Sequence, residues 1–181
     1  MLITSPSPGE GKTVTSVNLA WYLAEAGHNT CLVDLDFRAP GVSRALGYTI
    51  EEDGIEDVLT GKRSINQAIR QMGDRSLCVL GIRSRHVLPG EFLSTASVIP
   101  LLTELRTMFQ WIILDFAPVI PMADVGEVLP HVDGALMVVR SGKTEKSMIA
   151  PSLETLGSKI WGVILNDSPI NGSAYYAYYG N

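Results

Sequence analysis

The chain has 181 residues, of which 46% are hydrophobic and 18% are charged, and its formal net charge is -5 at pH 7. This length and composition suit one globular domain with a sizeable apolar core and exclude disordered, fibrous and repeat architectures. The acidic balance offers no overall basic surface, so we expect no nucleic-acid partner. No apolar run reaches the length of a membrane span and the first residues lack a secretory signal, which predicts a cytoplasmic protein.

Apolar runs of strand length alternate along the chain with stretches of helical spacing. The strand-length runs cover residues 1–4, 30–35, 77–82, 111–116, 134–139 and 161–166. The helical stretches cover residues 12–26, 98–109, 122–130 and 144–157, with two short helices within 54–73 and an irregular connector over 82–97. Because the strands are apolar on both faces, the pattern predicts an α/β fold, a doubly wound, mostly parallel sheet with helices on both faces.

The stretch "SPSPGEGKTV" links the first predicted strand to the first predicted helix, which is where a phosphate-binding loop (P-loop) occurs. The predicted nucleotide-binding residues are Pro8, Gly9, Glu10, Gly11, Lys12, Thr13 and Val14. The glycines allow backbone amides to converge on phosphate oxygens, Lys12 would reach the β- and γ-phosphates, and the Thr13 hydroxyl would bind Mg²⁺. Pro6 stands where the motif G-x-x-x-x-G-K-[ST] has its first glycine, and the alternative is an ordinary strand-to-helix turn with an exposed lysine.

Three aspartates close two further predicted strands. Asp34 and Asp36 share one face at period two in "LVDLDFR", and Asp115 ends the run "WIILD". The carboxyl ends of parallel strands meet at one edge of a sheet, so these carboxylates should lie near the P-loop, where they could hold Mg²⁺. The predicted catalytic residues are Lys12, Asp34, Asp36 and Asp115, and the predicted metal ligands are Thr13, Asp34 and Asp115. For any single aspartate, the alternative is a solvated strand end or a helix cap.

Taken together, "SPSPGEGKT", "CLVDLDFRAP" and "WIILDFAP" resemble the Walker A, Walker A′ and Walker B motifs of the bacterial tyrosine kinases of capsule and exopolysaccharide synthesis, the CpsD/CapB family. "GIEDVLTG", "VDGALMVVRSGKT" and "GVILN" are also similar to segments of that family, so the resemblance covers nearly the whole chain. It implies a MinD/ParA-like P-loop NTPase that uses ATP and Mg²⁺ as an autokinase regulating exopolysaccharide biosynthesis and export. Asp36 would orient the acceptor hydroxyl, with Asp34 assisting at the metal.

Two residues near the end of the chain join the predicted nucleotide site. Asn166 ends "GVILN", where related ATPases use an asparagine to read the edge of adenine, and Arg140 begins "RSGKT". For Arg140 the alternative is simple surface charge. Arg38 matches an arginine of the family that would contact phosphate or a neighbouring subunit, and its alternative is an ion pair with Asp36.

The last residues, "SAYYAYYGN", place Tyr175, Tyr176, Tyr178 and Tyr179 within five positions. The resemblance implies that they accept phosphate when the tail of one subunit enters the active site of its neighbour. We therefore divide the chain into a kinase domain over residues 1–168 and a flexible tyrosine-rich tail over 169–181. The alternative is an aromatic segment that is disordered or pairs along a sheet edge and has no enzymatic role.

The resemblance also implies partners: a second copy of the chain in a possible ring, a membrane adaptor of the polysaccharide co-polymerase type that recruits it to the inner face of the membrane, and a cognate phosphatase. The chain departs from the family at Phe116 and Ala117, where D-x-P-P is common, and it lacks the upstream helix with the E-x-x-R-x-x-R motif. It could thus be a trimmed piece or a minimal form with weakened self-association.

Two other functions stay open from the residues. A MinD/ParA-type switch ATPase would have the same fold, but it normally carries a lysine where this chain has Ser7. A nucleotide-binding scaffold without turnover would also retain the P-loop.

Overall fold

The computed structural model describes residues 1–73, 76–86, 90, 92–120 and 124–169. Within these residues one sheet holds seven strands: β1 (Leu2–Thr4), β2 (Thr30–Asp34), β3 (Arg70–Gln71), β4 (Leu77–Leu80), β5 (Trp111–Asp115), β6 (Ala135–Arg140) and β7 (Ile160–Asn166). Their order is β3-β4-β2-β5-β1-β6-β7. Only β3 runs antiparallel to its neighbour, so the predicted mostly parallel sheet is confirmed.

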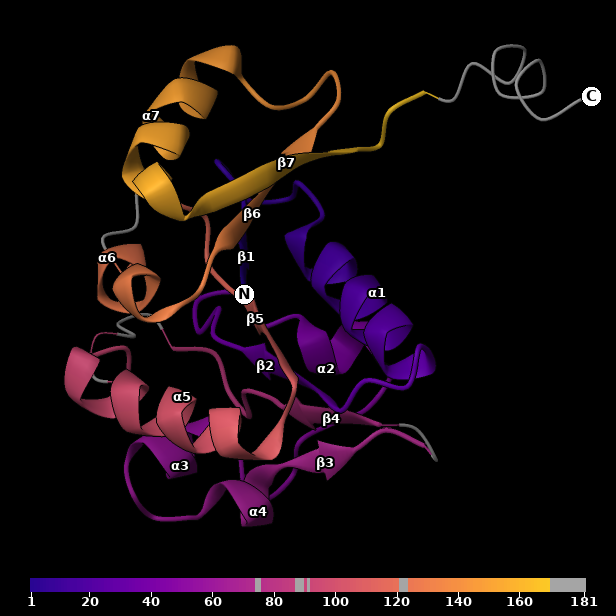
Figure 1. Cartoon of the computed structure of the whole chain (residues 1–181), viewed down its shortest axis with the longest axis vertical. Helices are drawn as coiled ribbons and strands as arrows, with labels where there is room; N and C mark the ends of the chain where they lie inside the picture. Colours follow the sequence, from indigo (N-terminus) through magenta and orange to yellow (C-terminus); the bar gives the residue numbers. More distant parts are fainter. Residues whose placement is uncertain (74–75, 87–89, 91, 121–123, 170–181) are drawn as a thin grey trace, which may run out of the picture.

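Helices cover both faces of this sheet (Figure 1). They are α1 (Lys12–Glu25), α2 (Val42–Ala45), α3 (Ile55–Leu59), α4 (Ile65–Ala68), α5 (Thr95–Met108), α6 (Val125–Val128) and α7 (Lys146–Leu156), with short 3₁₀ helices at Leu129–His131 and Gly157–Lys159. The helices α1 and α2 pack on one face, and α3 to α7 pack on the other. None of the helices in the described part of the chain has the length and apolarity that a membrane span requires.

Successive residues of the central strands enter different cores. In β1, Leu2 belongs to the core on the side of α5, and Ile3 belongs to the core on the side of α1. In β5, Leu114 lies in the α5-side core and Ile113 in the α1-side core. All four side chains are almost fully buried. Two buried faces explain why these strands read as continuous apolar runs in the sequence.

The structure differs from the sequence expectations at several elements. The helix predicted over 98–109 begins earlier, at Thr95, which shortens the irregular connector. The stretch predicted as a helix over 122–130 contains only the four-residue α6 and the 3₁₀ turn after it among its described residues. The short α2 and β3 were not predicted, because four and two residues are too few to show a periodicity.

Candidate active site

Three adjacent strands, β2, β5 and β1, end at the same edge of the sheet. There a cavity of about 550 Å³, here called the P-loop cavity, is lined by residues of the loop between β1 and α1 together with residues that follow β2, β4 and β5. From the predicted site it includes Pro8, Gly9, Gly11, Lys12, Thr13, Val14 and Asp36. The P-loop residues and Asp36 of the sequence prediction therefore meet in one hollow.

The backbone of the P-loop depends on its glycines. Gly9 has φ of 80° and Gly11 has φ of 92°, in the left-handed region that side chains disfavour. A Cβ on Gly11 would also lie 2.1 Å from Nδ2 of Asn166. Asn166 Nδ2 donates a hydrogen bond to the Glu10 carbonyl (2.9 Å), and Arg140 Nη1 donates to the Gly9 carbonyl (3.3 Å). Asn166 and Arg140, the two predicted nucleotide-binding residues of the last strands, thus hold the backbone of the P-loop through hydrogen bonds.

Glu10 does not line the P-loop cavity. Glu10 as a whole is 3% exposed, and it borders a second cavity of about 530 Å³ that Ser7, Arg140 and Thr144 also line. Among the described residues, no donor reaches either carboxylate oxygen in hydrogen-bond geometry. Burial raises the pKa of Glu10, and the nearby Thr144 hydroxyl and Ser7 amide only partly oppose that effect. The Glu10 side chain therefore faces away from Lys12 and Thr13.

Lys12 and Asp36 form a buried ion pair, with Nζ and Oδ2 2.5 Å apart and both side chains at least nine-tenths buried. Burial by itself would lower the pKa of Lys12, but the carboxylates of Asp115, Asp36 and Asp34 outweigh it and the pKa is raised. The lysine is therefore fully charged and fixed at the mouth of the loop. Moving Lys12 away from this pair leaves the buried Asp36 carboxylate without its counter-ion, so another donor must then take the place of the lysine.

Asp34 is bound by backbone amides. Its Oδ1 accepts from the Asp36 amide, and its Oδ2 accepts from the amides of Gly41 and Val42, all at 3.1 Å. Burial, followed by the proximity of Asp115, raises the pKa of Asp34 to about 7. Asp34 therefore shapes the loop between β2 and α2, in which Asp36 sits.

Asp115 retains an oxygen without a partner. Its Oδ1 accepts from the Ser16 hydroxyl at 3.0 Å, whereas its Oδ2 is buried and has no donor in the part of the chain that the structure describes. Burial raises the pKa of Asp115, while Lys12, the Thr13 hydroxyl and Ser16 act in the opposite sense. A buried carboxylate oxygen with no donor is costly, and a bound cation beside Thr13 would satisfy it. The chemistry of these two side chains therefore fits Mg²⁺.

Sequence reasoning missed three residues of this region. Ser16 lies one helical turn after Lys12 and holds Asp115, but a serine within an amphipathic helix gives no signal of such a role. Arg44 in α2 and Arg85 in the loop after β4 line the P-loop cavity. Arg38 pairs with Asp124, so the expected alternative of an ion pair with Asp36 is wrong, because Lys12 already occupies Asp36.

The predicted phosphate acceptors Tyr175, Tyr176, Tyr178 and Tyr179 lie outside the described residues. The boundary that we expect at residue 168 is likewise untested, because the description ends at residue 169. Both stay predictions from the sequence.

Comparisons with known proteins agree with this geometry. The CobQ/CobB/MinD/ParA nucleotide binding domain matches residues 1–175. The tyrosine-protein kinase YwqD of Bacillus subtilis is 35% identical over 184 residues, which cover 99% of this chain and 77% of that protein. The succinoglycan biosynthesis transport protein ExoP of Rhizobium meliloti is 29% identical, and its match covers 97% of this chain but 23% of that protein.

Solved structures show the same likeness. The VpsO kinase domain superposes with a TM-score of 0.85 at 32% identity, covering 93% of this chain and 84% of that one. The septum site-determining protein MinD of Pyrococcus horikoshii, complexed with Mg-ADP, has a TM-score of 0.75 at 22% identity over 97% of this chain and 75% of that one. At this identity, the likeness to MinD concerns the fold alone.

Proposed function

The chain belongs to the CobQ/CobB/MinD/ParA nucleotide-binding family and, within it, to the bacterial tyrosine-protein kinases. On this basis we propose which residues carry out the reaction and which tyrosines receive the phosphate. It is a protein-tyrosine kinase of capsule and exopolysaccharide biosynthesis. The γ-phosphate of ATP passes to Tyr175, Tyr176, Tyr178 and Tyr179 on the tail of a second copy. The observation that carries this assignment is the buried Lys12–Asp36 pair in the P-loop cavity.

The P-loop amides and Lys12 would hold the phosphates of ATP, and Arg140 and Asn166 keep that loop in place from the side of β6 and β7. Thr13 and Asp115 would hold Mg²⁺, which supplies positive charge to the phosphates when bound. Among the described residues no group of three or more His, Cys, Asp or Glu forms a metal cage. That suits a cation held by one carboxylate, a hydroxyl, water and the phosphates themselves. The role of Asp34 as a direct ligand stays a prediction.

Lys12 links nucleotide binding to activation of the acceptor. When Lys12 turns from Asp36 to the phosphates, the Asp36 carboxylate loses its counter-ion and becomes free to accept a hydrogen bond from a tyrosine hydroxyl. The phenol oxygen then forms a bond to the γ-phosphorus as the bond to the bridging oxygen breaks, ADP leaves, and the phenol proton passes to Asp36. Because the transition state of such transfers is loose, positioning contributes more than the strength of the base.

The setting of the reaction follows from the same family. We propose that a membrane adaptor of the polysaccharide co-polymerase type recruits the chain to the inner face of the membrane, and that a cognate phosphatase removes the tail phosphates. The likeness to one part of ExoP, whose name describes a transport protein, supports this adaptor. A ring of subunits would bring each tail to a neighbouring P-loop cavity.

The test compares the purified chain with Lys12→Ala after incubation with Mg-ATP, with Lys62→Ala as a control that removes an exposed lysine. Intact mass and peptide mapping report phosphate, and nucleotide affinity is measured alongside. We expect phosphate on the four tail tyrosines in the wild type and in Lys62→Ala, and none in Lys12→Ala. Nucleotide binding with no phosphotyrosine in any variant would count for the scaffold or the switch ATPase instead.

A further inference from the structure

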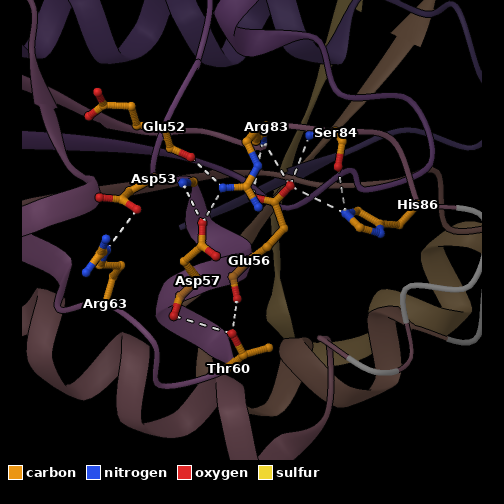
Figure 2. A network of polar contacts seen from close by, with 10 residues as sticks. Glu52, Asp53, Glu56, Asp57, Thr60, Arg63, Arg83, Ser84 and His86 are labelled. Carbon is orange, nitrogen blue, oxygen red and sulfur yellow. Dashed lines mark hydrogen bonds and ion pairs between the residues drawn. The ribbon is translucent and has the colours of Figure 1, made fainter.

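A polar network fixes the loop that follows β4 (Figure 2). Glu56 of α3 is 4% exposed and accepts hydrogen bonds from the backbone amides of Arg83 and Ser84, each at 3.0 Å to Oε1. His86 Nε2 lies 3.4 Å from the same oxygen, and the His86 ring packs edge-on against Phe37, the residue after Asp36. Helix α3 thereby ties this loop to the loop that carries Asp36.

The loop after β4 contains two arginines, Arg83 and Arg85, whose side chains have different surroundings. Arg83 is committed to the network, since its Nη1 donates to an Asp57 carboxylate oxygen at 2.7 Å and to the Glu52 carbonyl. Arg85, two positions later, lines the P-loop cavity and is exposed. Within the described ranges its side chain has neither a hydrogen bond nor an ion pair, and the same holds for the side chain of Arg44, which also lines the cavity. The other two cations of the cavity, Lys12 and Arg38, are both paired with aspartates.

The order of the strands places these two arginines beyond the end of the nucleotide. The P-loop follows β1, and the predicted adenine residue Asn166 lies on the side of β6 and β7. Arg44 and Arg85 follow β2 and β4 on the opposite side. With strands spaced about 4.8 Å apart, β4 lies roughly 14 Å from β1, past the aspartates where the γ-phosphate would end. The arginines are therefore on the side from which an acceptor enters.

The bare tail offers these arginines no side-chain anion. Residues 168–181 read "SPINGSAYYAYYGN" and contain no Asp, Glu, Lys or Arg. A phosphotyrosine carries a charge of about -1.5 to -2 and three acceptor oxygens, which match the planar donor fork of arginine. The tyrosines are arranged as two adjacent pairs, so a phosphate on one tyrosine is close to the next acceptor.

We propose that Arg44 and Arg85 bind a phosphotyrosine already formed on the incoming tail, so that a tail with one phosphate is a better acceptor than a bare tail. This inference rests on the proposed function, in which the tail is the substrate. Phosphorylation of the cluster is then self-reinforcing, because the first transfer creates the anion that the two arginines recognise. The network of Glu56 serves to hold Arg85 on the acceptor side.

The test uses the full chain with its four tail tyrosines changed to Phe as the kinase, and two synthetic peptides of residues 168–181 as acceptors. One peptide is bare and the other carries phosphotyrosine at position 179. We expect the KM for the phosphorylated peptide to be about tenfold lower, the effect of one charge-assisted hydrogen-bond partner. In Arg44→Ala and Arg85→Ala the two KM values should converge, and Arg85→Lys should keep part of the preference.

Arg106→Ala is the matched control, because it removes an exposed arginine from α5 that pairs with Asp133, away from the P-loop cavity. It should retain the full preference. Direct binding of the phosphorylated peptide without ATP gives a second readout, and it should weaken in both alanine variants. This inference would be overturned by equal KM values for the two peptides with the kinase that keeps both arginines. It would also be overturned by a preference for the phosphorylated peptide that survives both alanine changes. Either result would leave the proposed function standing. Transfer to neither peptide would instead count against the proposed function.

Discussion

Asp34 and Asp36 are two positions apart and are both 1% exposed, yet their oxygens meet different partners. Asp34 accepts three backbone amides, whereas Asp36 binds Lys12. The sequence predicts that both carboxylates lie at the site, because a period of two places them at one strand end. It cannot assign their partners, since the amides of Gly41 and Val42 return to Asp34 only when the following loop has folded.

The titration of Asp34 should be visible in the stability of the nucleotide-free protein. Its pKa is about 7 in the fold against an ordinary value of 3.8, so the folded state binds the proton more tightly. The contribution of this proton to the free energy of unfolding is fully present at pH values below the ordinary pKa of 3.8, and it is lost as the pH rises through about 7. We therefore expect the free energy of unfolding to fall with rising pH in this window for the wild type relative to Asp34→Asn. Urea unfolding across the window measures the difference, and a constant difference would contradict the assignment.

At the scale of elements, the long runs were predictable and the short connecting pieces were not. The pattern of Val, Ile and Leu located β2, β5, β6 and β7 to within two residues at each end. The loop after β4 was expected to be irregular, and residues 81–86 form neither a helix nor a strand. They are held by Glu56, which belongs to a different element and lies 27 residues before Arg83. A contact between residues so far apart leaves no periodicity in the sequence, so the pattern could reveal neither the Glu56 network nor the place of Arg85 in the cavity.

Glu56→Gln should loosen this loop without changing the charge of the P-loop cavity. A glutamine oxygen at the Oε1 position could still accept the amides of Arg83 and Ser84, but these bonds would lose the carboxylate charge. The glutamine nitrogen at the Oε2 position cannot accept from the Arg83 amide, which lies 3.2 Å from that position. We expect the free energy of unfolding to fall by about 2 kcal/mol and the amides of Arg83 and Ser84 to exchange faster with solvent. Glu104→Gln on the exposed side of α5 is the control and should change neither quantity. Unchanged exchange at both amides in Glu56→Gln would show that the carboxylate does not hold the loop.

At the scale of the whole molecule, the alternation of strands and helices predicted the parallel sheet and the edge at which the site lies. It did not predict the order of the strands, and that order separates Asn166 at the end of β7, the predicted adenine residue, from the arginines after β2 and β4. Under the proposed function, the nucleotide and the acceptor would lie side by side in the P-loop cavity along this edge of the sheet. Under the proposed function, the tyrosines of a tail that follows β7 must reach this cavity, and we propose that the tail comes from a second copy.

A mixing experiment tests this account most directly. One chain keeps Lys12 but has Phe at positions 175, 176, 178 and 179, and the other has Lys12→Ala with its tyrosines intact. Neither should label itself with Mg-ATP. When the two are mixed, the account predicts phosphate on the tail tyrosines of the Lys12→Ala chain, read by intact mass and peptide mapping. A Lys12→Ala chain that stays unphosphorylated in the mixture, while the wild type labels its own tail, would contradict transfer between copies.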